Sequence, residues 1–253
     1  MITQIGERLS VFISGHLRSQ KTPVAFFTAI PEACETRKIL SNLSEEEQER
    51  ATRFHFQSDC DNYIVAHAIK RIALAAVTGT RPKDVPLRIG PQGKPMLGAV
   101  GQIGKIEFNL SHTKGLVTFA LAVDTPIGVD AERVNLEIEI NSLAHSCFAI
   151  QEKHLLDALP GVSRQRAFFQ IWTMKEAYIK GIGRGLSLPL NSFFVPKLSR
   201  KSRICESLTG TSLDWITQNW QPTDTHYVST ALKCPLNRDC DVTVFELPLQ
   251  MVC

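Results

Sequence analysis

The chain has 253 residues, of which 43% are hydrophobic and 21% are charged, so it can form one sizeable domain or two smaller halves. Its formal net charge of +3 is too small to indicate nucleic acid as a partner, but it is compatible with an acidic protein or a phosphorylated ligand. No apolar run approaches the roughly 18 residues of a membrane span, and residues 1–8 contain an early acid and no signal-peptide stretch. We therefore expect a cytoplasmic protein without a membrane partner.

The cysteines do not form a recognisable pattern. There are seven, an odd number, and no two are spaced as C-x-x-C, which disfavours both a disulfide framework and a zinc site. We expect most of them to be reduced, small, buried residues. They stand at positions 34, 60, 147, 205, 234, 240 and 253.

In the first half of the chain, one strand and two helices are predicted. A strand is expected around residues 24–27. Ser44 and Glu47 have the spacing of a capping box, which predicts a short helix from Ser44 to about Phe54. The polar run 58–61 predicts the capped start of a longer helix that continues to Val77, just before a glycine.

The middle of the chain indicates strands. Residues 90–95 are rich in proline and glycine and predict a loop. Residues 106–112 alternate strictly between apolar and polar, which predicts a half-buried strand that ends at a histidine. Strands are also expected at 116–123 and 127–132, and the short turn between them predicts an antiparallel hairpin. On the second strand, Asp130 and Glu132 then share one face.

The second half begins with a predicted helix near residues 147–159, followed by a Pro-Gly break and a longer helix through 168–180. On that longer helix, Trp172, Glu176 and Lys180 are four residues apart and form one stripe. Glycines at 181, 183 and 185 end the helix and allow close approach of a ligand to the backbone. Strands are expected at 226–232 and 241–247.

A short helix with an acidic start followed by a longer apolar helix occurs twice, at 44–77 and at 145–180. The two segments share negligible sequence identity. The repeated order nevertheless predicts a pseudo-duplicated architecture, with the two halves meeting within residues 113–126.

The carboxylates at 130 and 132 are the first candidates for chemistry. Side by side, they repel each other unless a cation lies between them, and oxygen ligands without nearby histidine or cysteine suit Mg²⁺. The alternative is a solvated polar strand face. Glu176 and Lys180 have a similar pair of interpretations: either a surface ion pair, or a third metal ligand or base together with a proton donor.

Several basic side chains are candidates for phosphate binding. His112, beside Ser111 at a strand end, could donate a hydrogen bond to a phosphate, and Lys94 in the glycine-rich loop could reach another. Arg50 and Arg53, one turn apart, could hold a third phosphate, although exposed helical arginines need no such role. The chain has no G-x-x-x-x-G-K-[ST] sequence, which excludes the P-loop class.

Together these segments resemble the signature blocks of the 4′-phosphopantetheinyl transferases, in particular the larger, surfactin-synthetase-type members. The resemblance covers roughly residues 44 to 195, and the blocks stand in the family's order and spacing. The blocks are the Arg53-Phe54 helix end, Gly93-Lys94-Pro95, Asn109-Leu110-Ser111-His112, Gly128-Val129-Asp130-Ala131-Glu132, Trp172 to Lys180 and Gly183 to Leu190.

The resemblance implies an α+β fold in which two similar halves, residues 1–118 and 119–253, form a pseudo-dimer within one monomeric chain and enclose the active site in the cleft between them. The implied activity is Mg²⁺-dependent transfer of 4′-phosphopantetheine from coenzyme A to a serine of an apo acyl or peptidyl carrier protein, with release of adenosine 3′,5′-bisphosphate. A non-catalytic relative that binds coenzyme A or a carrier is the alternative, which loss of a metal carboxylate or of the lysine would favour.

The resemblance also implies roles for individual residues. Asp130, Glu132 and Glu176 would bind Mg²⁺, which bridges the coenzyme A pyrophosphate, and Lys180 would contact the same pyrophosphate. Glu176 or a metal-bound water would remove the serine proton, with Glu176 and Lys180 as the catalytic pair. Coenzyme A would also be bound by a set in the first half: His112 at a phosphate, with Asn109 and Ser111; Gly93 and Lys94 at the adenine and ribose; and Arg50 at the 3′-phosphate. The chain departs from the family at Asn62 and Tyr63, where a basic or hydroxyl side chain often supports the phosphates.

Overall fold

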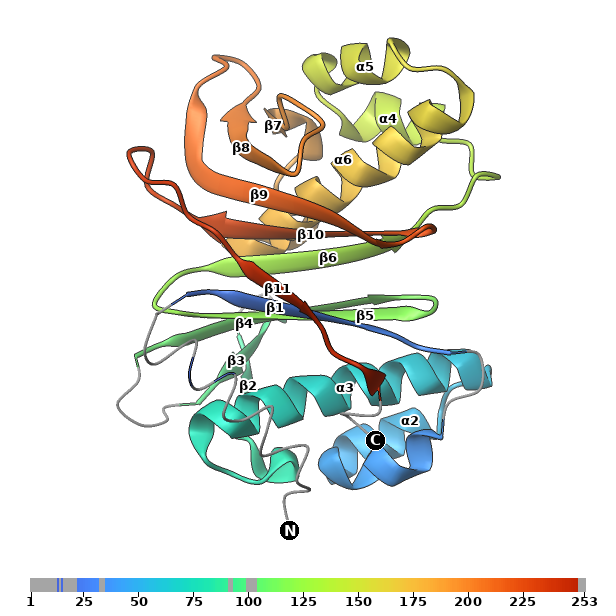
Figure 1. The fold of residues 1–253 in the computed structure, drawn as a ribbon, viewed down its shortest axis with the longest axis vertical. Helices are drawn as coiled ribbons and strands as arrows, with labels where there is room; N and C mark the ends of the chain where they lie inside the picture. The colour runs from blue at the N-terminus through green and yellow to red at the C-terminus, as the bar shows by residue number, and fades with distance from the viewer. Residues whose placement is uncertain are drawn as a thin grey trace. The chain divides into compact units, whose positions relative to one another are not determined.

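The structure is a computed structural model that describes residues 13, 15, 22–31, 35–90, 93–98 and 104–249 (Figure 1). The N-terminal residues 1–8, residues 91–92 of the predicted loop, and Cys34 and Cys253 lie outside the described residues. The chain divides into two compact units. Unit 1 contains Met1–Asp124 and Thr243–Cys253, and unit 2 contains Thr125–Val242. The boundary that we predicted at 118–119 falls inside strand β5, which belongs wholly to unit 1.

Unit 1 is a four-stranded sheet with a long helix on one face. The strand order is β11-β1-β5-β4, in which β1 is antiparallel to β5 and parallel to β11. Helix α3 packs its apolar side chains against this sheet, where Phe26, Phe108 and Phe119 belong to the same core (Figure 1). The elements are β1 (Val24–Ala29), η2 (Thr36–Asn42), α2 (Glu45–Ala51), α3 (Gln57–Thr78), η3 (Pro82–Asp84), β2 (Leu87–Ile89), β3 (Pro95–Leu97), β4 (Ile106–Thr113), β5 (Leu116–Val123) and β11 (Thr243–Glu246).

Unit 2 is a five-stranded sheet of order β6-β10-β9-β8-β7 with helix α6 packed along β6, β10 and β9 (Figure 1). Its core contains Met174, Ile179 and Trp215. The elements are β6 (Ile127–Arg133), α4 (Asn141–Cys147), α5 (Ile150–Asp157), α6 (Gly161–Ile182), η4 (Gly185–Ser187), η5 (Leu190–Ser192), β7 (Phe193–Phe194), β8 (Lys201–Glu206), β9 (Ser212–Thr223) and β10 (His226–Lys233).

The hairpin predicted between 116–123 and 127–132 is wrong, although both strands exist. Strand β5 is paired on both edges, with β4 and with β1, so neither edge is left for β6. The hairpin partner of β5 is β4, and Gly115 supplies the left-handed residue (φ 83°) of the turn between them. Strand β6 pairs with β10 instead, with Asp130 opposite Ser229.

The helix predictions were right about the elements and less accurate about their ends. The capping box is confirmed, because the Ser44 hydroxyl accepts from Glu47 N while Glu47 Oε2 accepts from Ser44 N. The cap predicted at 58–61 is wrong: α3 begins at Gln57, and the buried Asp61 accepts hydrogen bonds from Thr36 and Gln57. The helix expected at 147–159 is confirmed as α5, and the short helix α4 that precedes it was not predicted.

One pair of cysteines departs from the expectation of reduced thiols. Cys234 and Cys240 form a disulfide that closes the loop between β10 and β11. Cys60, Cys147 and Cys205 are free. The spacing of six residues has no recognised signature, and Arg203 donates to the Cys234 and Pro235 carbonyls, which helps to form the loop.

The predicted internal repeat is confirmed. Helices α2 and α3 correspond to α5 and α6, and each long helix ends at a left-handed glycine, Gly79 or Gly183. The sheets repeat as well, since β1-β5-β4 in unit 1 has the same order and antiparallel pairing as β6-β10-β9 in unit 2. The fold is therefore an α+β fold of two similar halves.

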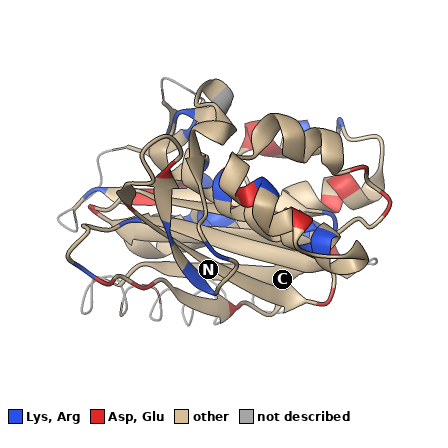
Figure 2. Ribbon diagram, turned by 90° about the horizontal axis from the view of Figure 1, so that it is seen from above, with Lys and Arg blue, Asp and Glu red and all other residues tan. Residues whose placement is uncertain are grey.

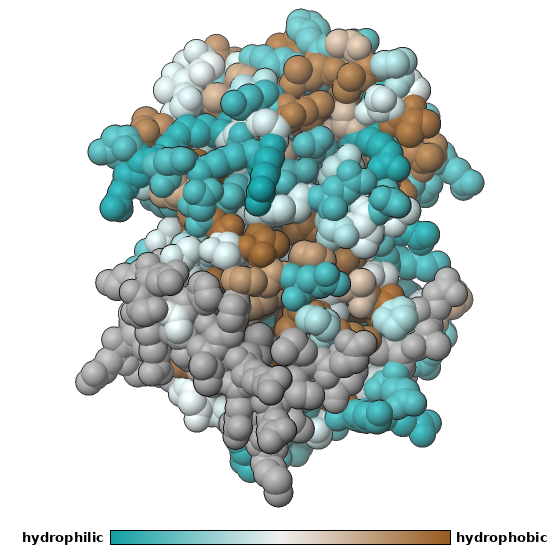
Figure 3. Space-filling model, in the orientation of Figure 1, coloured by the Kyte–Doolittle hydropathy of each residue, from teal (hydrophilic) through white to brown (hydrophobic). Residues whose placement is uncertain are grey.

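The surface is charged in both signs. Lys and Arg are interspersed with Asp and Glu along the ribbon in Figure 2, as expected for a small net charge. In the space-filling view, hydrophilic side chains alternate with smaller apolar areas on the visible face of unit 2 (Figure 3). None of the helices in the described part of the chain has both the length and the apolar composition of a membrane span.

Candidate active site

Helix α6 leaves only one line of side chains accessible in its central part. From Ile171 to Ile179, every residue except Trp172 and Glu176 is buried, and Lys180 follows one turn later with its side chain 31% exposed. The sheet covers one side of the helix, while α5 and the segment around Phe193 cover others. The stripe predicted from the spacing is therefore the accessible edge of an otherwise enclosed helix.

Asp130 is buried beside this stripe. It lies at the middle of β6, is 3% exposed, and accepts a hydrogen bond from Lys180 Nζ at 2.5 Å. A carboxylate that belonged to a solvated strand face would be exposed, so that alternative is wrong for Asp130. The ion pair brings the strand predicted to carry the metal ligands into contact with the helix predicted to carry the base.

Glu132 and Glu176 are close enough to influence each other and Asp130. Burial and then the charge of Asp130 raise the pKa of Glu132 to about 7, with a smaller contribution from Glu176. Burial and then Asp130 also raise the pKa of Glu176, while Lys180 acts in the opposite direction. Three carboxylates and one lysine of unit 2 thus share one electrostatic environment, in which a cation would be favoured.

Glycine makes this arrangement sterically possible. A Cβ on Gly128 would lie 2.0 Å from the Ala177 carbonyl oxygen and 2.4 Å from Gly181 N. A Cβ on Gly181 would in turn lie 2.7 Å from the ring of Trp215. The backbones of β6 and α6 therefore touch two residues before Asp130, and only glycine permits that approach.

A buried ion pair lies behind the stripe and was not identified from the sequence. Lys175 and Glu152 have fully buried side chains, and Lys175 Nζ is 2.6 Å from Glu152 Oε2. The backbone amides of Ala149 and Val195 donate to the same carboxylate. The sequence did contain a signal for this pair: a glutamate and a lysine are separated by 23 residues in both halves, as Glu47 and Lys70 and as Glu152 and Lys175.

The candidate phosphate-binding residues of β4 are divided between two faces of the unit 1 sheet. Phe108 packs into the core with α3, so its face also carries His112 by the alternation of the strand. His112 is exposed. The pKa of His67 on α3 is lowered mainly by burial and then by Lys70, and His112 makes a smaller contribution in the same direction. Asn109 and Ser111 belong to the opposite face, where Ser111 is buried.

The glycine-rich loop holds its two candidates differently. Gly93 has a left-handed backbone (φ 77°) and donates its N–H to the Gly90 carbonyl. Lys94 lies against β4, with Nζ 4.0 Å from Glu107 Oε2, and its pKa is lowered mainly by burial. Its partly buried ammonium group is well placed to act as a hydrogen-bond donor.

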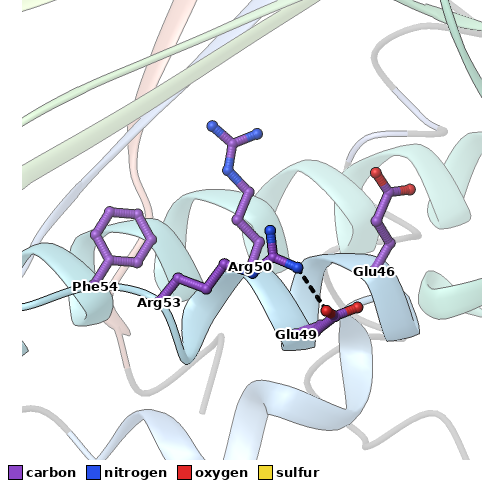
Figure 4. A pocket seen from close by; sticks show the side chains of 5 residues that line it. All are labelled: Glu46, Glu49, Arg50, Arg53 and Phe54. Atoms are coloured by element: carbon purple, nitrogen blue, oxygen red, sulfur yellow. Dashed lines mark hydrogen bonds and ion pairs between the residues drawn. The ribbon is translucent and has the colours of Figure 1, made fainter.

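Arg50 lines an open pocket of about 480 Å³ at the end of α2, with Glu46, Glu49, Arg53 and Phe54 (Figure 4). Arg53 is paired with Glu49 at 2.5 Å. The Arg50 side chain extends away from this ion pair in Figure 4. The Arg50 guanidinium lies 5.7 Å from the ring centre of Tyr63. Burial raises the pKa of Tyr63 to about 12, and its hydroxyl has no hydrogen-bond partner among the described residues.

The described residues contain no group of three or more His, Cys, Asp or Glu already gathered as a metal cage. Asp130 is instead bound to Lys180. The oxygen donors of Asp130, Glu132 and Glu176 nevertheless fit Mg²⁺ chemically, because hard oxygen ligands with open positions for water and phosphate are what this ion takes.

Family models match both units. The model described as the 4′-phosphopantetheinyl transferase superfamily matches residues 126–231, and that described as the N-terminal part of 4′-phosphopantetheinyl transferase matches residues 30–124. A 4′-phosphopantetheinyl transferase of Bacillus subtilis is 31% identical over 64% of this chain and 70% of its own length. The chain belongs to the 4′-phosphopantetheinyl transferase family, as the sequence blocks predicted. Its relatives include the 4′-phosphopantetheinyl transferase Sfp of Bacillus subtilis, which is 30% identical over 64% of this chain and 69% of Sfp.

Other relatives are matched over a smaller share of their length. The 4′-phosphopantetheinyl transferase HetI of a Nostoc species is 34% identical over 62% of this chain, and the chain spans 66% of that protein. For the transferase gsp of Aneurinibacillus migulanus, the identity is 32% over 63% of this chain and 64% of gsp. The chain thus spans somewhat less than two thirds of these two relatives.

Proposed function

We propose that this protein transfers the 4′-phosphopantetheine group from coenzyme A to a serine hydroxyl of an apo acyl or peptidyl carrier protein. The observation that supports it most directly is the convergence of Asp130, Glu132, Glu176 and Lys180 at the contact between β6 and α6, in a chain of this family. The alternative of a non-catalytic relative is disfavoured, because all four side chains are present and share one environment.

Asp130, Glu132 and Glu176 would hold Mg²⁺ in this proposal. The bound ion would neutralise charge on the pyrophosphate of coenzyme A. Lys180 would donate to the pyrophosphate, because its long side chain is partly exposed. Lys180 then stabilises the charge that develops on the departing bisphosphate.

Glu176 is proposed as the base. Its carboxylate lies on the accessible stripe of α6, where the hydroxyl of a carrier serine could reach it. The serine oxygen attacks the β-phosphorus of coenzyme A as Glu176 takes its proton, a new P–O bond forms, and the bond to the 5′-phosphate breaks. The products are the modified carrier and adenosine 3′,5′-bisphosphate.

Unit 1 would bind the nucleotide end of coenzyme A. Arg50 is proposed to bind the 3′-phosphate, with Gly93 and Lys94 at the adenine and ribose and the Asn109, Ser111 and His112 set at the phosphates. The buried Tyr63 ring, 5.7 Å from the Arg50 guanidinium, would support the position of that side chain. A monomeric state and a cytoplasmic location remain predictions from the sequence.

The test of the reaction is mass spectrometry. Several apo carrier proteins of the fatty-acid, polyketide and peptide types are incubated with coenzyme A and Mg²⁺. We expect at least one to gain the mass of phosphopantetheine, and the gain to stop when EDTA removes the metal. If every carrier keeps its original mass while a known transferase modifies the same samples, the proposed reaction is wrong.

The 3′-phosphate assignment is tested with Arg50→Ala. We expect KM for coenzyme A to rise about tenfold, because a charge-assisted bond is lost, while 3′-dephospho-coenzyme A is used equally by the wild type and the variant. The matched control is Arg53→Ala, which removes a neighbouring arginine already paired with Glu49. Equal increases in KM for both substrates would contradict the role of Arg50.

A further inference from the structure

The buried pair of Glu152 and Lys175 connects three separate elements of unit 2. Both side chains are 0% exposed, and Lys175 Nζ donates to Glu152 Oε2 at 2.6 Å and to the Phe193 carbonyl at 2.7 Å. Glu152 Oε1 accepts from Val195 N at 2.9 Å, and Oε2 accepts from Ala149 N at 3.0 Å. The pair therefore joins α6 to the start of α5 and to the segment around β7.

Unit 1 contains an equivalent ion pair, between Glu47 and Lys70. Glu47 is the third residue of α2 and Lys70 lies on α3, with Nζ 2.8 Å from Glu47 Oε1. The sequence separation is 23 residues, as it is between Glu152 and Lys175. Both acids also accept a hydrogen bond from the amide of the N-cap residue three positions earlier.

The two copies differ in what stands beside the pair. In unit 1, Lys70 is followed by Arg71, and β1 carries no acidic residue. In unit 2, Lys175 is followed by Glu176, and β6 carries Asp130 and Glu132. The pair itself is thus common to both halves, whereas only unit 2 has acids that it could position.

The location of Lys175 on α6 shows how it could act on the neighbouring stripe. Successive helix residues are about 100° apart, so the buried Lys175 restrains the rotation of the helix whose next residue is Glu176. On the strand side, the contact at Gly128 limits how the helix can shift. The helix is held at both places, and the direction in which Glu176 and Lys180 emerge is restricted accordingly.

We propose that Glu152 and Lys175 are positioning residues that hold Glu176 and Lys180 in the orientation in which they meet the carboxylates of β6. The proposal rests on the proposed function of that site. It assigns the pair no contact with substrate. Loss of the pair lets α6 rotate or shift, and the metal affinity of the site falls even where the protein stays folded.

Metal binding tests this directly, with Mn²⁺ as the probe and electron paramagnetic resonance of free Mn²⁺ as the readout. Lys175→Met keeps the length and apolar stem of the side chain and removes its donors. We expect a 10- to 100-fold weaker Mn²⁺ affinity, the range seen when groups supporting metal ligands are lost. In the transfer assay, kcat should fall while KM for coenzyme A changes less than threefold.

A second variant covers the case in which Lys175→Met does not fold. Glu152→Gln combined with Lys175→Met leaves no lone buried charge, so its folding is easier to retain. It also lacks the ion pair, and we expect the same loss of Mn²⁺ affinity in the folded protein, checked by circular dichroism. Wild-type Mn²⁺ affinity in this double variant would overturn the proposal.

The matched control is Lys70→Met, which breaks the equivalent pair in unit 1. It should lower the melting temperature without changing Mn²⁺ affinity, which separates positioning from a general loss of stability. Equal weakening of Mn²⁺ binding by Lys70→Met would show a general effect and overturn the proposal. If the wild type binds no Mn²⁺, the metal assignment itself fails. If Mn²⁺ binds normally to both Lys175 variants, only the positioning role is wrong.

Discussion

At the scale of single residues, Asp130 and Glu132 differ more than their common strand face suggests. Asp130 is enclosed and paired with Lys180, whereas Glu132 is only partly buried and has its pKa raised to about 7 by burial and by its neighbour. Substitution of Asp130 should therefore have a different consequence from substitution of Glu132. Substitution of Asp130 removes the charge partner of Lys180, whereas substitution of Glu132 removes a group that binds a proton.

Asp130→Asn is expected to lower kcat/KM for carrier modification by about 100-fold or more, because the variant loses charge at the place where metal and pyrophosphate would bind. The measurement is the initial rate over a range of Mg²⁺ concentrations, which should no longer saturate normally. Glu137→Gln, an exposed acid in the segment after β6, is the control and should retain the wild-type rate. Unchanged Mg²⁺ dependence in Asp130→Asn would exclude this carboxylate as a ligand.

The pKa of Glu132 predicts a pH dependence of stability in the metal-free protein. Because the folded pKa is raised above its ordinary value of 4.5, the folded state binds the proton more tightly than the unfolded state. This contribution to stability is fully present below pH 4.5 and is lost as pH rises through about 7. The loss should be on the order of 3 kcal/mol, at about 1.4 kcal/mol for each unit between 4.5 and about 7.

Chemical unfolding of the wild type and Glu132→Gln between pH 4 and 8, in EDTA, measures this contribution. As pH rises, the unfolding free energy of the wild type should fall relative to that of Glu132→Gln. A difference that is constant with pH would mean that Glu132 titrates normally.

At the scale of elements, the contact between β6 and α6 places the site. Gly128→Ala is expected to destabilise the protein by more than about 3 kcal/mol, because the new methyl group would meet the Ala177 carbonyl and the Gly181 backbone, which have little room to shift. Denaturant unfolding gives the free energy. The remaining folded protein should bind Mn²⁺ more weakly.

Gly79→Ala is the matched control for this substitution. Gly79 ends α3 with φ 71° and has no atom within 4 Å of an added Cβ, so only the left-handed backbone is penalised. That penalty is about 1 kcal/mol. Equal destabilisation by the two substitutions would show that close packing at Gly128 contributes nothing.

At the scale of the whole molecule, the chain leaves unit 1 after Asp124, forms unit 2, and returns at Thr243. The returning strand β11 pairs in parallel with β1, and its Phe245 ring lies 6.0 Å from that of Phe26. Thr28 Oγ1 also donates to the Leu247 carbonyl. Unit 1 is therefore completed by residues distant in sequence.

Truncation after Val242 tests this dependence. We expect faster hydrogen exchange throughout β1 and β5, because the sheet loses an edge strand and part of its core. Strands β6, β10 and β9 of unit 2 serve as the internal control and should exchange at their original rates. Unchanged protection of β1 would show that unit 1 is stable without β11.

The sequence by itself determined the longer helices, the strands β1, β4, β5, β6, β10 and β11, and the stripe of Trp172, Glu176 and Lys180, because these depend on local periodicity and capping. Helix α4 and the strands β2, β3, β7, β8 and β9 were not predicted. It also identified the family, because the blocks stand in order. The pairing of β5 with β4 and β1, the disulfide and the Glu152–Lys175 pair were decided only by the tertiary structure. Each of these features joins groups that lie apart in the sequence. A local sequence pattern does not show which of the possible partners such a group will contact. The burial of Asp130 against Lys180 belongs with them, since spacing alone allowed the strand face to be solvated.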